Sequence, residues 1–361
     1  TVFGLTVNNK IYDGTTTVTS SDLVTNDTTS GETLAFSGSG TVSSANVQNN
    51  QSITLGSIAI ADGSGGGLAS NYNLTTGTFD ISQKWVNVGG QKIYDATTTV
   101  SSSDLDVTGE VTGESISIAG TGSVTDKNVG SGKTIDISGL SLSDGSHSAS
   151  NYTIGTTSFA ITRRNLSISG EKVYDGTGTV LASQIDTVNT AGGETLTISG
   201  EGSVSLPSVG TNKSITLNTL GISNGTNGTI GLASNYTLNS GSFDITTKPI
   251  TLSGSRQYDG TTDVASSDLT LIGQVSGESI SITGTGSVTD KNVGAGKTIN
   301  TTGLSLADNT SNASNYSLST GTFTINNKIL SISGTRAYDG STTVSSGNIS
   351  LNGLIGSETL N

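Results

Sequence analysis

One dipeptide, Tyr-Asp, recurs at nearly constant spacing, and this repetition constrains the fold more than any other feature. The intervals between successive pairs are 82, 80, 84 and 80 residues, and the pairs are Tyr12-Asp13, Tyr94-Asp95, Tyr174-Asp175, Tyr258-Asp259 and Tyr338-Asp339. Internal repetition at a fixed period sets the architecture before any local pattern does. We therefore interpret the chain as a segment of a longer array, with units at 1–84, 85–164, 165–248, 249–328 and, in part, 329–361.

Alternating apolar and polar residues indicate short β-strands throughout each unit. Each unit closes on a strand with Phe and Ile two residues apart: Phe79-Ile81, Phe159-Ile161, Phe243-Ile245 and Phe323-Ile325. Apolar residues are only 31% of the chain, a share that is also typical of disordered proteins. However, the chain has only two prolines and its apolar residues alternate regularly, which favours a folded all-β array over disorder. We expect about six strands per unit in a β-sandwich, partly open barrel or grasp-like sheet. A parallel β-helix is the alternative, although its sub-period of about 20 residues is not visible.

The connections between units are too short to act as flexible tethers. Each closing strand reaches the next unit through four residues, which contain no glycine: 82–85, 162–165, 246–249 and 326–329. We therefore expect the units to stack end to end as an elongated rod. Strands of about ten residues predict units about 35 Å long and a segment of about 150 Å.

The Tyr-Asp pair itself is typical of a turn at the edge of a small core. We expect the ring to cover that edge, with a hydroxyl that stays wet or meets the backbone. The Asp carboxylate is expected to accept from the N–H two residues later. Glycine follows in four units but Ala96 replaces it in the second. Because alanine tolerates positive φ poorly, we predict that the backbone at this position does not need a positive φ.

Other recurring motifs are also interpreted as structural. A cation precedes each pair (Lys10, Lys92, Lys172, Arg256 and Arg336) and is expected to neutralise a charge or pack beside the tyrosine. Ser169-Gly170 predicts a turn before the Tyr-Asp pair, and Ser103-Asp104-Leu105 is compatible with a short helical turn or with a strand after a bulge. A second dipeptide ends the polar loop of each unit: Asn71-Tyr72, Asn151-Tyr152, Asn235-Tyr236 and Asn315-Tyr316.

The recurring Tyr-Asp-Gly, the Asp126-Lys127-Asn128-Val129-Gly130 run and the Ser-Asn-Tyr motif resemble the YDG-type repeats of very large bacterial surface adhesins. Many of those proteins are also similar to filamentous haemagglutinins. The resemblance covers essentially the whole chain and implies an extracellular stalk or adhesive array, at the cell surface or secreted, with roles in attachment and biofilm. It brings no catalytic residues. The chain departs from the pattern at Ala96 and at Leu206-Pro207-Ser208, which replaces Asp-Lys-Asn.

Charge and composition argue against several classes of partner. The net charge is −13 with only 15 basic residues, so no basic stripe is present to bind nucleic acid. No apolar run approaches the roughly 20 residues of a membrane-spanning helix. Cysteine and methionine are both absent, which excludes disulfides and thiolate metal sites and suits an exposed, extracellular setting.

No catalytic constellation emerges, and we expect neither an enzyme nor a cofactor. The lone histidine, His147, lies in a polar loop and is interpreted as solvated, so a triad lacks its base. Among metals we consider calcium, for which Asp126-Lys127-Asn128 and Asp290-Lys291-Asn292 would supply the ligands. A lysine sits between the would-be ligands, so turn capping is the preferred interpretation.

Three functions follow as hypotheses. The first is a structural stalk whose partners are its own neighbouring repeats and which presents binding regions for attachment. The second is an array that binds host or matrix glycans, which predicts solvent-facing aromatics; Trp85 is the only tryptophan. The third is a filament in which like chains associate through unpaired edge strands.

Overall fold

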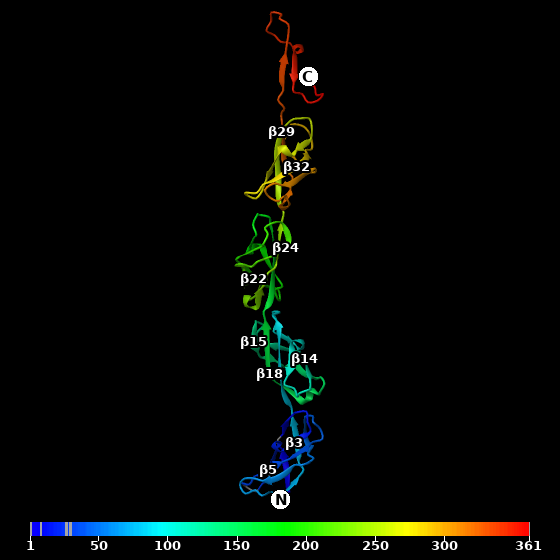
Figure 1. Cartoon of the computed structure of the whole chain (residues 1–361), viewed down its shortest axis with the longest axis vertical. Coiled ribbons are helices and arrows are strands. Elements are labelled where there is room, and N and C mark those ends of the chain that lie inside the picture. Colours follow the sequence, from blue (N-terminus) through cyan, green and yellow to red (C-terminus); the bar gives the residue numbers. More distant parts are fainter. Residues whose placement is uncertain (1, 8, 26–27, 29–30, 361) are drawn as a thin grey trace. The chain divides into compact units, whose positions relative to one another are not determined.

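The computed structural model describes residues 2–7, 9–25, 28 and 31–360, and Figure 1 shows the whole chain. The side chains of the predicted first strand, Phe3, Leu5 and Val7, lie outside the described residues. The chain divides into two compact units. The first contains residues 1–165, 190–195 and 227–237, and the second contains 166–189, 196–226 and 238–361.

Short β-strands make up each repeat, and the described residues contain no α-helix. In repeat 1 the strands are β1 (Val2–Val7), β2 (Lys10–Ile11), β3 (Thr17–Thr19), β4 (Leu23–Thr25), β5 (Leu34–Ser37), β6 (Ser39–Thr41), β7 (Gln48–Ser52), β8 (Ala59–Asp62), β9 (Asn73–Thr75) and β10 (Thr78–Ser82). In repeat 2 they are β11 (Lys84–Ile93), β12 (Thr99–Ser101), β13 (Leu105–Thr108), β14 (Ile116–Val124), β15 (Gly130–Lys133), β16 (Ile135–Asp136), β17 (Leu140–Asp144) and β18 (Tyr152–Thr162).

The later repeats are also built from short strands. In repeat 3 the strands are β19 (Arg164–Val173), β20 (Thr179–Leu181), β21 (Ile185–Val188), β22 (Glu194–Ser199), β23 (Glu201–Ser203), β24 (Gly210–Ser214), β25 (Gly221–Asn224), β26 (Thr229–Ile230), β27 (Tyr236–Leu238) and β28 (Ser242–Thr246). Repeat 4 and the partial repeat 5 contain β29 (Lys248–Gln257), β30 (Asp263–Ala265), β31 (Leu269–Ile272), β32 (Ile280–Ser287), β33 (Gly294–Thr298), β34 (Leu304–Asp308), β35 (Tyr316–Leu318), β36 (Thr322–Asn326), β37 (Ser331–Gly334) and β38 (Ile349–Asn352).

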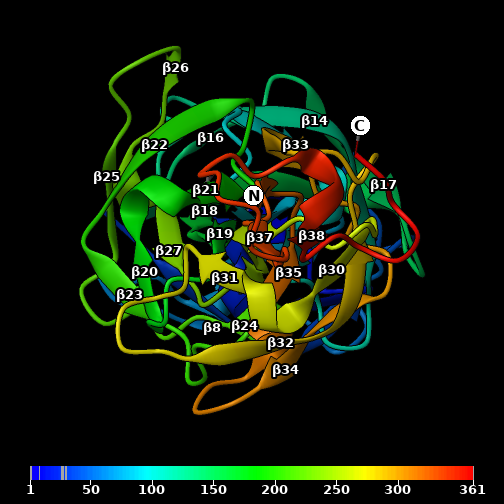
Figure 2. The ribbon, with the colours of Figure 1, turned by 90° about the horizontal axis from the view of Figure 1, so that it is seen from above.

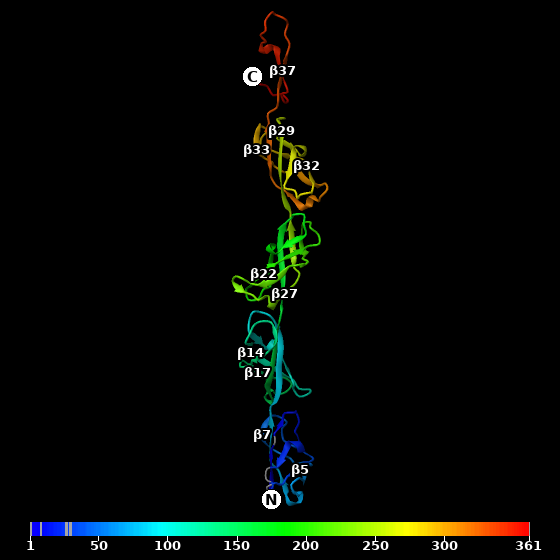
Figure 3. The same ribbon diagram turned by 90° about the vertical axis from the view of Figure 1, so that its left-hand side faces the viewer.

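Repeat 2 shows how one unit is built. Its main sheet has the order β13-β11-β18-β15, in which β11 and β18 are parallel and the outer pairs are antiparallel. A second group follows the order β12-β14-β16, and β17 pairs with the first half of β14. In Figure 3, β14 and β17 lie side by side, and in Figure 2 the equivalent β32 and β34 of repeat 4 do so. The all-β prediction is confirmed, and the repeats form neither closed barrels nor a β-helix in the described residues.

The predicted turn at Ser169-Gly170 is wrong, because β19 runs through both residues without interruption. Gly170 lies opposite Phe243 of the parallel strand β28, and a Cβ on it would come within 2.0 Å of the Gln184 carbonyl oxygen. That distance is a hard clash. Glycine is therefore required here for the close approach of another backbone segment, and its conformational freedom is not the reason.

The Ser-Asp-Leu motif forms a single 3₁₀ turn, the first of the two alternatives. The turn spans Ser102–Asp104 in repeat 2, and its equivalents are Ser20–Asp22, Ala182–Gln184, Ser266–Asp268 and Ser346–Asn348. The Asp104 carboxylate accepts from the N–H of Ser101 at 3.2 Å, so the turn is capped by its own third residue. A second 3₁₀ turn precedes each closing tyrosine, at Ala69–Asn71, Ala149–Asn151, Ala233–Asn235 and Ala313–Asn315.

The hydrophobic cores run across the boundary between consecutive repeats. One cluster joins Phe79 and Ile81 of repeat 1 to Val86 and Tyr152 of repeat 2. Another joins the core of repeat 3 to four residues of repeat 4: Ile250, Ile280, Ala313 and Tyr316. The apolar surface buried in these two clusters stabilises the boundary between repeats 1 and 2 and that between repeats 3 and 4 by the hydrophobic effect.

Candidate functional site: the repeat junctions

The tyrosine of each Tyr-Asp pair reaches into the next repeat. The Tyr94 hydroxyl donates a 2.7 Å hydrogen bond to Oε1 of Glu194, which follows Gly193 and begins strand β22 of repeat 3. Equivalent bonds join Tyr12 to Glu114 at 2.8 Å, Tyr174 to Glu278 at 2.5 Å, and Tyr258 to Glu358. The expectation that this hydroxyl stays wet or meets the backbone is wrong. Its acceptor is a carboxylate about 100 residues away, which period-two alternation could not reveal.

The same carboxylate accepts a second tyrosine hydroxyl, from the Asn-Tyr motif of its own repeat. Tyr236 donates to Oε2 of Glu194 at 2.8 Å, Tyr152 to Glu114 at 2.5 Å and Tyr316 to Glu278 at 2.6 Å. The hydroxyl of Tyr236 also accepts from the N–H of Ala191 at 3.0 Å, so its donor and acceptor capacities are both used. In the first repeat Tyr72 donates to Glu32 in the same way.

The two tyrosines at each junction also pack against each other. The ring centroids of Tyr94 and Tyr236 are 5.5 Å apart at an interplanar angle of 79°. Tyr12 and Tyr152 lie at 5.4 Å and 78°, and Tyr174 and Tyr316 at 5.6 Å and 81°. This edge-to-face geometry is favourable for aromatic pairs. We call each set of two tyrosines and their shared glutamate a Tyr–Glu–Tyr clasp.

The asparagine of each Asn-Tyr motif binds the preceding repeat. Asn235 Oδ1 accepts from the N–H of Val129 at 2.9 Å, and its Nδ2 donates to Asn128 at 2.9 Å. Asn151 makes the equivalent pair of bonds with Val47 and Asn46, and Asn315 accepts from Val209. These three asparagines are buried, whereas Asn71 of repeat 1 is exposed. Burial of this side chain thus accompanies its contact with a preceding repeat.

The aspartate of the Tyr-Asp pair has a separate, local role. Asp95 Oδ1 accepts from the N–H of Thr97 at 2.9 Å, as the predicted turn requires, and the same bond forms at Asp13, Asp175, Asp259 and Asp339. The buried Lys92 ammonium donates to Asp95 and to the carbonyls of Thr97 and Thr99. Burial pushes the pKa of Asp95 up, but Lys92 and the turn donors outweigh it and hold that pKa below its usual range. The predicted neutralising role of the cation is confirmed here.

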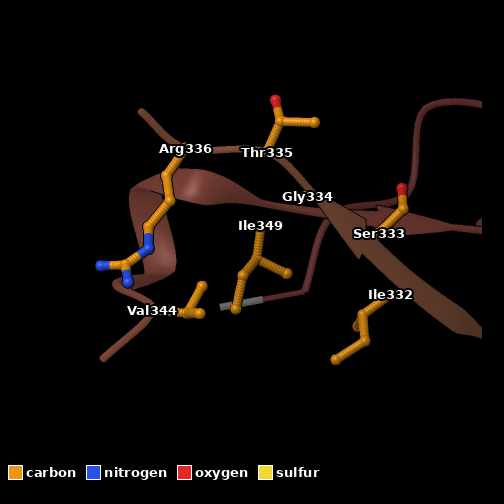
Figure 4. A pocket seen from close by; sticks show the side chains of 7 residues that line it. All are labelled: Ile332, Ser333, Gly334, Thr335, Arg336, Val344 and Ile349. Atoms are coloured by element: carbon orange, nitrogen blue, oxygen red, sulfur yellow. The ribbon is translucent and has the colours of Figure 1, made fainter. Parts of the chain in front are cut away.

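The fifth copy separates the two roles. Asp339 keeps its turn and its ion pair with Arg336 at 2.9 Å, yet the Tyr338 side chain is 95% exposed. The turn therefore forms without the burial of the tyrosine. Beside it, Ile332, Val344 and Ile349 line an apolar hollow together with Arg336 (Figure 4).

The prediction that the residue after Tyr-Asp does not need positive φ is wrong. Ala96 has φ of 65°, close to the 77° of Gly14 and the 80° of Gly176. The left-handed conformation is thus kept in the one repeat that lacks glycine, at a cost of roughly 1–2 kcal/mol.

The junctions differ in the charge near the glutamate. Glu194 pairs with Lys127 at 2.9 Å, and its side chain is only 1% exposed. Burial alone would raise the pKa of Glu194, but Lys127 and the two tyrosine hydroxyls outweigh burial and lower it. Ala45 and Pro207 occupy the equivalent positions at two other junctions. His147 lies beside the first clasp, with Nε2 4.0 Å from Glu114, and its side chain is half exposed.

The described residues contain no group of three or more His, Asp or Glu side chains placed to hold a metal ion. Asp126 accepts from the N–H of Asn128 at 3.0 Å and from Lys133 at 3.1 Å, which is turn capping. Lys127, between the would-be ligands, points to Glu194 instead. Among the described residues, no helix has the length and apolar character that crossing a bilayer demands.

Comparison with known families gives one result. A model of the YDG domain matches the chain four times in tandem, over residues 1–79, 83–159, 162–243 and 245–324. This match confirms the resemblance to YDG repeats. A search of the curated proteins found no match.

Proposed function

We propose that this chain, which belongs to the YDG domain family, is a stalk segment of a bacterial surface or secreted adhesin. Its role in this proposal is to hold other binding regions away from the cell. The Tyr–Glu–Tyr clasp supports the proposal best. It uses the tyrosines and glutamates that recur in the chain to bind one repeat to the next.

The clasp takes the place that a flexible linker would have between two repeats. A flexible linker would let the repeats move independently, and would then give no defined reach. Here the boundary combines a shared apolar core, a buried carboxylate with two phenol donors and a capped loop of the preceding repeat. An array of this kind is expected to resist bending, and a stalk requires that property.

Small-angle scattering of the full chain tests the mechanical part. We expect a maximum dimension of about 150 Å for stacked repeats. The variant Tyr94→Phe/Glu194→Ala should broaden the distribution of dimensions without unfolding the repeats, as checked by circular dichroism. A compact particle for the unmodified chain would contradict the stalk.

Surface labelling tests the location independently. An antibody raised against the chain should label intact producing cells or their secreted fraction. Labelling that appears only after permeabilisation would contradict the adhesin assignment and leave the clasp unaffected.

One observation favours glycan binding as a second candidate function. Trp85 is 75% exposed and lies with Ile11 and Gln83 in a groove at the first junction. Solvent-facing indole rings are suited to stacking against the apolar face of a sugar ring. Calorimetric titration with matrix polysaccharides, with Trp85→Ala compared against Tyr338→Ala, should show heat lost only in the first variant. Equal binding by both would remove this candidate.

A further inference from the structure

We propose that the tyrosine pairs of the clasps are sites of oxidative cross-linking, where a peroxide-derived one-electron oxidant joins consecutive repeats through dityrosine. The pairs are Tyr12 with Tyr152, Tyr94 with Tyr236 and Tyr174 with Tyr316. This cross-linking depends on the junctions alone and not on where in or outside the cell the chain is located.

The composition directs oxidants to tyrosine. The chain has no cysteine, no methionine and one tryptophan, so the usual sulfur targets of oxidation are missing. It has nine tyrosines, and six of them stand in the three pairs. An oxidising equivalent that enters the protein therefore finds most of its phenols already in pairs.

The two rings of each pair are in contact, with centroids 5.4 to 5.6 Å apart. Dityrosine forms between ring carbons next to the hydroxyl-bearing carbon. In each pair both hydroxyls bind one carboxylate, so the hydroxyl ends of the two rings lie near each other. The rings are nearly perpendicular, and coupling requires one of them to rotate about its long axis. That rotation leaves the hydroxyl in place, because the hydroxyl lies on the axis, and the terminal torsion of tyrosine is soft.

The shared glutamate supplies the base that the oxidation needs. Burial, followed by the hydrogen bond and charge of Glu114, raises the pKa of Tyr12 to about 12, and burial with Glu114 raises that of Tyr152 to about 12. The phenols are therefore protonated at neutral pH, and each must lose a proton along with its electron. A carboxylate that already accepts the hydroxyl hydrogen bond is placed to take that proton.

The reaction balances with hydrogen peroxide as the final oxidant. Each tyrosine loses one electron and its phenolic proton, which gives two neutral tyrosyl radicals. The radicals couple through one new carbon–carbon bond, and the two ring hydrogens at that bond move to the oxygens and restore both phenols. Hydrogen peroxide takes up two electrons and two protons to give two water molecules. The pairs are buried, so the oxidant stays outside the junction. The coupling requires only that electrons and protons leave the junction.

The test is oxidation of the dilute, folded full chain with a photogenerated ruthenium(III) tris-bipyridyl oxidant and persulfate. We expect a monomer whose intact mass falls by two hydrogens per coupled junction, and peptide mapping that joins Tyr94 to Tyr236. Tyr236→Phe should lose that one cross-linked peptide and keep the other two. Tyr338→Phe, which removes the exposed tyrosine, should keep all three.

Two further measurements separate geometry from general reactivity. Glu194→Gln keeps an acceptor oxygen but removes the base, so the yield at that junction should fall relative to the other two. In concentrated urea the specific pairs should disappear. Cross-links confined to Tyr338 or to bonds between molecules, with the clasp pairs unmodified in a folded chain, would overturn the proposal. So would an unchanged Tyr94 cross-link in Tyr236→Phe.

Discussion

Ala96 and Gly192 face each other across the second junction, since a Cβ atom built on Gly192 would lie 3.0 Å from the Cβ of Ala96. At the other junctions a glycine follows Tyr-Asp and faces a branched side chain. A Cβ on Gly176 would come within 2.9 Å of Val275, and the corresponding distances are 3.2 Å from Gly14 to Val111 and 2.8 Å from Gly260 to Ile355. Ala191 takes the place of that valine in repeat 3. Ala191 of repeat 3, which is smaller than valine, therefore leaves room for the methyl group of Ala96 in repeat 2.

This compensation predicts a coupled pair of substitutions. Ala191→Val alone should lower the opening free energy of this junction by about 1–3 kcal/mol, because the added methyl groups meet Ala96. Ala96→Gly should be neutral or slightly stabilising, since relief of about 1–2 kcal/mol of backbone strain offsets the greater freedom of glycine. The double variant should recover most of the loss. Native-state hydrogen exchange of the junction amides measures all three, and an equal cost of Ala191→Val in both backgrounds would refute the compensation.

The clasp predicts that the tyrosine and the glutamate are energetically coupled. Trp85, the only tryptophan, lies at the first junction and serves as the fluorescent probe there. Tyr12→Phe leaves the Glu114 carboxylate, whose side chain is 7% exposed, with one phenol donor fewer. We expect a loss of about 1–3 kcal/mol in urea unfolding followed by Trp85 fluorescence.

The double variant Tyr12→Phe/Glu114→Gln should cost less than the sum of the single variants, with a coupling energy of about 0.5–3 kcal/mol. Asp106→Asn, which removes an exposed carboxylate from the neighbouring strand β13, is the matched control and should change stability by less than about 0.5 kcal/mol. Strictly additive costs would show that the hydroxyl and the carboxylate do not act together.

The sequence alone predicted the parts of this molecule that depend on local pattern. The repeat period, the all-β class and the Asp95 turn follow from spacing, alternation and the hydrogen-bonding reach of a short side chain. Each of these is decided within a few residues, or by simple repetition of the motif.

The clasp could not be predicted in this way, because Tyr94 and Glu194 meet only when two repeats dock. A signal was nevertheless present. A glutamate recurs after glycine in each repeat at a position that should be a solvated strand end, and a carboxylate repeated with that constancy indicates a partner. The error at Ala96 has the same origin, since the residue that makes room for its methyl group lies in the next repeat.

The buried asparagines predict a contrast between two equivalent positions. Asn235→Ala removes the acceptor for the Val129 amide and should destabilise the second junction by about 1–3 kcal/mol. Asn71→Ala changes the same motif where the side chain is exposed, and should have an effect within about 0.5 kcal/mol. Hydrogen–deuterium exchange of the peptide that contains Val129 should speed up in the first variant only. Equal protection in both variants would mean that the asparagine does not cap the preceding repeat.

Alkaline pH should open the junctions before it affects the rest of the array. Burial, followed by the carboxylate, raises the pKa of Tyr12, Tyr152 and Tyr174 to about 12, and burial raises that of Tyr236 to about 12. The unfolded value is about 10. A folded pKa above the unfolded one means that the stabilisation is complete below about pH 10 and is lost as the pH rises towards 12.

Tyrosinate absorbance of the native chain should therefore rise in two steps, with the clasp tyrosines in the later step. In urea all nine tyrosines should ionise together near pH 10. Glu114→Gln should move part of the later step to lower pH, because the charge of the carboxylate disappears while the burial of Tyr12 and Tyr152 remains. A single native step near pH 10 would show that the phenols are open to solvent, and the clasp as described would then be wrong.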